Sequence, residues 1–97
     1  MTIYRIGEVN AKAETIEDLR DFMISIMPLI KGSEGCISCQ FYQSQDDPAK
    51  FLMIEVWESP DLHQESVKNI PPEKLNEIRP RLGDSPSGGY FGLIAEL

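Results

Sequence analysis

The chain of 97 residues has few of the side chains that metal, redox and nucleic-acid sites use. It contains one histidine and two cysteines, which are too few for a disulfide framework and leave zinc short of its three or four ligands. Only 9 basic residues stand against 16 acidic ones, so the formal net charge is −7. A field of that sign repels phosphate backbones, and we therefore expect no nucleic-acid partner.

Long apolar runs are absent as well. No stretch approaches the roughly 20 apolar residues that a membrane-spanning helix requires. Met1 is followed directly by strand-like sequence, without the basic and then apolar segment of a secretory leader. These absences predict a cytoplasmic protein that has no membrane partner. The length of 97 residues predicts one domain over residues 1–97.

What the sequence does contain is an apolar segment at 51–56, bounded by turn residues on both sides. A strand with one solvent face would alternate apolar and polar residues, so a nearly continuous apolar run predicts a strand that is buried on both faces. Strand alternation divides the segment into two sets: Phe51, Met53, Glu55 and Trp57 on one face, and Leu52, Ile54 and Val56 on the other. Helices are expected to cover one of these faces, and a second copy of the chain the other.

The remaining elements follow from periodicity and from helix-start and turn residues. Strands are predicted over 3–11, 36–44 and 90–97, and an amphipathic helix over 15–31. Ser59 and Pro60 begin a short helix, and a further helix covers 72–82, where Pro80 disturbs it. The order strand, helix, strand, strand, helix, helix, strand predicts an α+β fold of the ferredoxin-like, split βαβ type, with a four-stranded antiparallel sheet and helices on one face.

Three short motifs resemble those of a known family: Glu34-Gly35-Cys36 before a strand, Asp46-Asp47-Pro48 in a turn, and Glu55-Val56-Trp57-Glu58-Ser59 at a strand end. With them, nearly the whole chain resembles the antibiotic biosynthesis monooxygenase family. The resemblance implies that two subunits pair sheet to sheet as a homodimer, forming a dimeric α+β barrel. For many members it implies oxygenation of electron-rich aromatics such as quinols without metal, flavin or other cofactor, because the substrate itself supplies the electron to oxygen.

The chain departs from its relatives in the helix after Trp57. Many relatives have a histidine at the position of Ser66, whereas the histidine of this chain is His63, one turn earlier. Relatives that degrade haem have theirs at the position of Val67, so the resemblance to that branch is weaker.

His63 is the candidate catalytic base. A neutral imidazole on the inward side of its helix, sharing a face with Ser66, is suited to take a proton from a phenol or quinol because its pKa lies close to neutral pH. The open alternative is an ordinary hydrogen-bonded histidine at a helix edge.

Glu55 is the candidate acid, because an ionised carboxylate inside an apolar strand is costly unless it is paired. If Glu55 pairs with Arg5 or Lys68, its role is structural. If it has no basic partner, its pKa rises toward a value that suits proton transfer.

The candidate substrate-binding residues are apolar and aromatic. Trp57 offers a large ring for stacking on a flat ligand, or it fills the core at the end of its strand. Phe22, Met23 and Met53 line a ligand cavity between helix and sheet, or they are core residues only.

Cys36 and Cys39 form a C-x-x-C motif. Their spacing on a strand is expected to direct the sulfurs to opposite faces, which argues against a redox pair, and one histidine cannot complete a zinc site. We therefore expect no metal site.

Two functional hypotheses remain. In the first, the protein is a cofactor-independent monooxygenase of a quinol or polycyclic aromatic: His63 takes the proton, Trp57 stacks on the ring, and Glu55 with Ser66 orients polar groups. In the second, it is a non-catalytic small-molecule-binding or interaction module of the same fold, in which these side chains are only packed.

Overall fold

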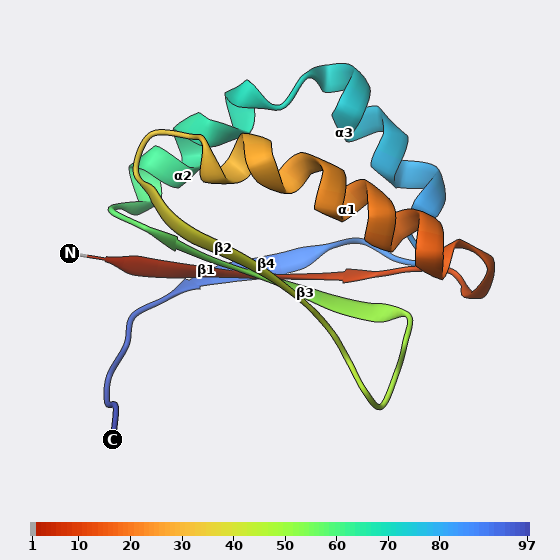
Figure 1. The fold of residues 1–97 in the computed structure, drawn as a ribbon, viewed down its shortest axis with the longest axis horizontal. Helices are drawn as coiled ribbons and strands as arrows, with labels where there is room; N and C mark the ends of the chain where they lie inside the picture. Colours follow the sequence, from red (N-terminus) through yellow and green to blue (C-terminus); the bar gives the residue numbers. More distant parts are fainter. Residues whose placement is uncertain (1) are drawn as a thin grey trace.

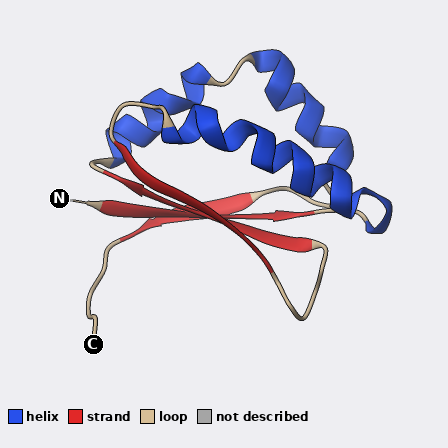
Figure 2. Cartoon of the chain, in the orientation of Figure 1, coloured by secondary structure: helices blue, strands red, loops and turns tan. Residues whose placement is uncertain are grey.

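The computed structural model describes residues 2–97 as a four-stranded antiparallel sheet with helices on one face (Figures 1 and 2). The strands are β1 (Ile3–Asn10), β2 (Cys36–Gln43), β3 (Lys50–Trp57) and β4 (Ser87–Phe91), in the spatial order β2-β3-β1-β4. The helices are α1 (Ile16–Lys31), α2 (Pro60–Ser66) and α3 (Pro72–Ile78), and three short 3-10 turns flank them: η1 (Ala13–Thr15), η2 (Val67–Asn69) and η3 (Arg79–Arg81). The predicted ferredoxin-like order of elements is confirmed.

β3 lies inside the sheet, hydrogen-bonded to β1 on one side and β2 on the other. Its helix-facing residues are buried, and Phe51 and Trp57 are fully so: Phe51, Met53, Glu55 and Trp57. The opposite set is partly exposed: Leu52, Ile54 and Val56. The predicted division of the strand into two faces is therefore confirmed, and within residues 2–97 helices cover one of them.

α1 and α2 form the layer nearest the site. The buried side of α1 comprises Leu19, Phe22, Met23, Ile26 and Ile30. Ser59 caps α2 as predicted, because its Oγ accepts a hydrogen bond of 3.2 Å from the Leu62 backbone N–H, and Pro60 occupies the first turn.

Gly35 explains why the turn before β2 needs a glycine. Its φ is 85°, a conformation that residues with a Cβ rarely adopt. An added Cβ would also lie 2.5 Å from Leu62 Cδ1. The glycine therefore permits the close packing of α2 against the start of β2.

Two predicted boundaries were wrong. The helix predicted over 72–82 ends as an α-helix at Ile78 and continues as the 3-10 turn η3, because Pro80 has no N–H for the α-helical pattern.

The last strand was predicted over 90–97 but lies at Ser87–Phe91. Phe91 pairs with Tyr4, close to the beginning of β1. The residues after Phe91 therefore have almost no residues of β1 left to pair with. Residues 92–97 leave the sheet on the side away from the helices (Figure 1).

The sheet face opposite the helices bears apolar side chains. Tyr42 and Phe91 are exposed there, and a groove of about 330 Å³ lies between Leu52, Ile6 and β4. Among residues 2–97, no helix is long and apolar enough to cross a membrane.

Candidate active site

The sheet register brings four polar side chains into one row beneath the helices. Cys39 pairs with Glu55, Glu55 with Arg5, and Arg5 with Tyr90, so the row crosses β2, β3, β1 and β4 in turn. Directly paired residues of antiparallel strands point to the same face. Glu55 is buried under the helices, and the whole row therefore shares its side of the sheet.

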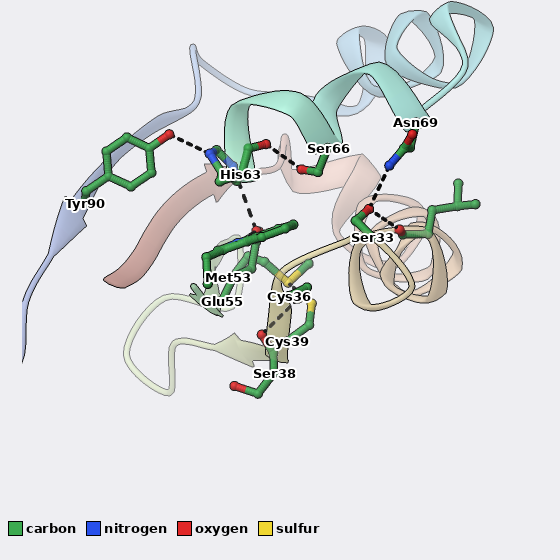
Figure 3. Close-up of polar contacts among 12 residues, drawn as sticks. Ser33, Cys36, Ser38, Cys39, Met53, Glu55, His63, Ser66, Asn69 and Tyr90 are labelled. Atoms are coloured by element: carbon green, nitrogen blue, oxygen red, sulfur yellow. Dashed lines mark hydrogen bonds and ion pairs between the residues drawn. The ribbon is translucent and has the colours of Figure 1, made fainter. Parts of the chain in front are cut away.

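His63 of α2 lies over this row (Figure 3). Its Nδ1 and the Tyr90 hydroxyl share a hydrogen bond of 2.6 Å. Its Nε2 lies 3.9 Å from Glu55 Oε1, and the imidazole meets the Trp57 ring edge to face, with centroids 5.4 Å apart. Contacts with side chains of two strands, β3 and β4, thus fix the orientation of the imidazole.

Glu55 is held by Trp57. Its Oε1 accepts a hydrogen bond of 2.8 Å from the indole Nε1, and the residue is only 8% exposed. Burial raises the pKa of the Glu55 carboxyl, while the indole bond and the positive charge of Arg5 oppose the rise. Neither ion pair considered for Glu55 is present, because Lys68 pairs with Glu65 and Arg5 makes none of the three ion pairs in residues 2–97.

The pKa of the His63 imidazole is also shifted. Burial lowers its pKa from the ordinary value of 6.5, and the nearby positive charge of Arg5 lowers it further. The ring is therefore neutral at neutral pH and free to accept a proton.

A cavity of about 180 Å³ opens beside His63, between the sheet and α1. Met23, Met53 and Glu55 line it together with Arg5 and Gly7. Part of its floor is Gly7, which pairs with Gly88 of β4 and has no side chain to fill the space above the sheet. A Cβ added at Gly7 would meet nothing closer than 3.8 Å, so this part of the floor is open.

The structure brings together most, but not all, of the predicted site residues. His63, Glu55, Met53 and Met23 line the cavity, and Trp57 contacts two of them from the side.

Two predicted residues lie elsewhere. Phe22 packs beneath the guanidinium of Arg81, 5.4 Å from its ring centroid. Ser66 is buried, but its hydroxyl donates to the His63 carbonyl oxygen at 2.5 Å (Figure 3) and lines a separate hollow beside Glu34 and Asn69.

The expectation that Cys36 and Cys39 face opposite sides was wrong. A β-bulge between Cys36 and Ser38 adds one residue to β2, so that both thiols pack toward the core (Figure 3). Burial raises the pKa of Cys36, and it raises that of Cys39 to about 12, with the Glu55 charge adding to both. Both sulfurs are free thiols, and the part of the chain that the structure describes has no cluster of three or more His, Cys, Asp or Glu side chains for a metal ion.

Sequence reasoning missed two residues of this site, Tyr90 and Arg5. Tyr90 was expected to begin the last strand rather than to lie near its end, and Arg5 was considered only as a partner for Glu55. Strand register is the signal that finds both, because Arg5 pairs with Glu55 on one side and with Tyr90 on the other.

The chain belongs to the antibiotic biosynthesis monooxygenase family, whose family model matches residues 2–82. A search of curated protein sequences gives no match.

Solved structures agree with this assignment at the level of the fold. SnoaB of Streptomyces nogalater, a cofactor-independent oxygenase, superposes with a TM-score of 0.82 at 11% identity, over 99% of this chain and 96% of that one. Rv0793 of Mycobacterium tuberculosis gives 0.82 at 17% identity, covering 99% of this chain and 98% of that one. PA3566 of Pseudomonas aeruginosa gives 0.82 at 16% identity, covering 97% and 95%.

Proposed function

We propose that the protein is a cofactor-independent monooxygenase of a small quinol, with His63 as the general base. The observation that carries the proposal is a neutral imidazole, anchored through Nδ1 to Tyr90, at the wall of a small cavity with polar and apolar lining residues. Family membership supports the reaction class. The two free thiols fit a protein of the reducing cytoplasm.

The cavity volume favours a single substituted ring over a polycyclic aromatic. An apolar cavity of about 150 Å³ accepts a benzene molecule, whereas sites for drug-sized ligands span about 300–1,000 Å³. The cavity beside His63, at about 180 Å³, is near the lower figure. Trp57 then acts on the ligand through its edge contact with His63 and its bond to Glu55.

The reaction begins with a proton transfer. With Nδ1–H donating to the Tyr90 oxygen, Nε2 carries the lone pair and takes the proton of a quinol hydroxyl. The imidazolium that forms has Glu55 Oε1 3.9 Å from its Nε2, so an ionised Glu55 carboxylate would stabilise it.

The remaining steps use only the substrate and oxygen. The quinol anion passes one electron to O₂, and the semiquinone and superoxide combine to form a carbon–oxygen bond. The resulting hydroperoxide loses water, so that one hydroquinone and one O₂ give one hydroxyquinone and one H₂O. The imidazolium returns its proton to the oxygen that leaves as water.

Oxygen uptake with a series of one-ring hydroquinones and a three-ring anthrone tests the proposal. We expect uptake with the one-ring substrates, a loss of about 10²–10⁴-fold in rate for His63→Ala, and little uptake with anthrone. Gln64→Ala, an exposed neighbour on α2, is the matched control and should keep the wild-type rate.

The control outcomes separate the two hypotheses. Absence of uptake by the wild type favours a non-catalytic binding module. Equal uptake by wild type and His63→Ala removes His63 from the mechanism.

We further propose that the protein acts as a homodimer paired through the open sheet face. Leu52, Ile54 and Val56 are partly exposed there, beside exposed Tyr42 and Phe91. Full burial of each of the three aliphatic side chains contributes about 1.5–3 kcal/mol, which favours a stable pair. The apolar residues of the C-terminal segment, Leu93, Ile94 and Leu97, are exposed in the single chain and leave the sheet on this side (Figure 1), where a second subunit would cover them.

A further inference from the structure

Arg5 is the one Lys or Arg side chain among the residues that line the cavity beside His63. It projects from the centre of the polar row, between Glu55 and Tyr90, and its guanidinium stacks on the Tyr90 ring at 5.3 Å. Gly88 leaves the space that the guanidinium occupies, since a Cβ there would lie 2.7 Å from Arg5 Nη2. Stacking on the Tyr90 ring and the space left by Gly88 hold the guanidinium of Arg5 at the cavity wall.

The guanidinium of Arg5 has no ion-pair partner in residues 2–97, although its charge acts on the nearby Glu55 carboxyl and opposes the rise of that group's pKa. Glu55, its neighbour in the row, bonds to Trp57 instead, and Glu8, which also lines the cavity, accepts a bond from Asn10. In residues 2–97, the buried side-chain nitrogen that lacks a hydrogen-bond partner belongs to Arg81, not to Arg5. The nitrogens of Arg5 that form no hydrogen bond are therefore not buried, and they remain open to the cavity or to solvent.

An open guanidinium at the wall of a small cavity is a recognition group for a carboxylate. Its planar N–H donors match two carboxylate oxygens, and charge-assisted bonds of this kind are stronger than neutral ones. The protein as a whole repels anions, with a formal net charge of −7. A preference for an anionic ligand must therefore come from Arg5 at short range.

We propose that the ligand of this cavity is a one-ring aromatic acid, whose carboxylate binds Arg5 while its hydroxyl faces His63. The aromatic part rests on the proposed function, whereas the preference for an anion rests on Arg5 and is measured without turnover. A dihydroxybenzoate offers a carboxylate to Arg5 and a hydroxyl to His63.

Binding under anaerobic conditions tests this inference. The probes are 2,5-dihydroxybenzoate and 2,5-dihydroxybenzamide, which share the ring and both hydroxyls and differ in charge. Trp57 is the only tryptophan and lies beside the cavity, so its fluorescence reports binding. We expect the wild type to bind the carboxylate about tenfold or more tightly than the amide at 0.15 M salt, where repulsion by distant charges is largely screened.

Three variants test whether Arg5 causes the preference for the carboxylate probe over the amide. Arg5→Gln should bind both probes with equal affinity. Arg20→Gln loses the same charge from an exposed site on α1 and should keep the wild-type preference. Gly88→Ala keeps all charges but displaces the guanidinium, and should reduce the preference, which keeps the inference testable if Arg5→Gln does not fold.

The contrary results are equally clear. Equal binding of the two probes by the wild type, binding of neither, or an unchanged preference in Arg5→Gln or Gly88→Ala overturns the inference. Oxygen uptake with neutral hydroquinones is scored separately. Uptake without a carboxylate preference refutes the role of Arg5 alone, and a preference without uptake refutes the oxygenase alone.

Discussion

Replacing Trp57 by Phe tests whether the indole–carboxylate bond holds the site together. The indole is fully buried and donates at 2.8 Å to a carboxylate that is itself 8% exposed. Losing a bond to a buried charged group costs about 1.5–3 kcal/mol, and the smaller ring costs about 1 kcal/mol more in packing. We therefore expect Trp57→Phe to lower the free energy of unfolding by about 2.5–4 kcal/mol.

A double-mutant cycle separates the two contributions. Glu55→Met replaces the acceptor with an apolar side chain of similar length. In that background Trp57→Phe should cost only the packing loss of about 1 kcal/mol, so the coupling energy should be about 1.5–3 kcal/mol. Urea unfolding followed by far-UV circular dichroism measures all four proteins, at one protein concentration because the proposed dimerisation would make the measured stability depend on concentration.

The result that would refute the reasoning is a cost of Trp57→Phe that does not depend on residue 55. The indole would then be a packing residue only, and Glu55 would owe its position to something other than the bond from Trp57.

Three further predictions concern pH, assembly and thiol reactivity. Because burial lowers the pKa of His63, kcat/KM should stay level as the pH falls toward 6.5 and decline only below it; a midpoint above 6.5 would show another group acting as the base. Leu52→Asp should convert the proposed homodimer to a monomer in light scattering, while Gln64→Asp on the helix side should not; a wild-type monomer in dilute solution would contradict the proposed dimer itself. Cys39, whose pKa is raised to about 12, should resist iodoacetamide at pH 8 until the protein unfolds, and rapid labelling of the native protein would contradict its burial.

A fourth prediction follows from the raised pKa of Glu55. A folded-state pKa above the ordinary 4.5 means that this group stabilises the fold fully below pH 4.5 and loses that contribution as the pH rises through the folded value. Glu55→Gln should therefore gain stability relative to wild type as the pH increases from about 4 to about 7.5. Urea unfolding at both pH values measures the difference, and a gain that is equal at both would show that the carboxyl titrates normally.

The fold was largely predictable because its strongest signals are local. The apolar run of β3, the amphipathic period of α1 and the Ser59-Pro60 start of α2 each depend on neighbouring residues. The last strand was misplaced because it was predicted to begin only at residue 90, after Gly88 and Gly89. Their pairing with β1 is a long-range property that composition does not reveal.

The site was predictable only in part, for the same reason. His63 and Glu55 stand out in the sequence because each is an isolated polar residue in a patterned segment. The partnership of His63 with Tyr90 joins residues 27 apart, and the open position of Arg5 depends on the Gly88 opposite it. The bulge that turns both thiols inward is a one-residue irregularity of β2, and simple alternation cannot anticipate it.

The most direct test of the central claim is an anaerobic crystal structure with a one-ring hydroquinone bound. The account predicts the ring in the cavity between Met23 and Met53, with a hydroxyl at hydrogen-bond distance from His63 Nε2 and Nδ1 still bonded to Tyr90. A ring on the opposite sheet face, or a cavity that stays closed while the ligand is bound elsewhere, would contradict it.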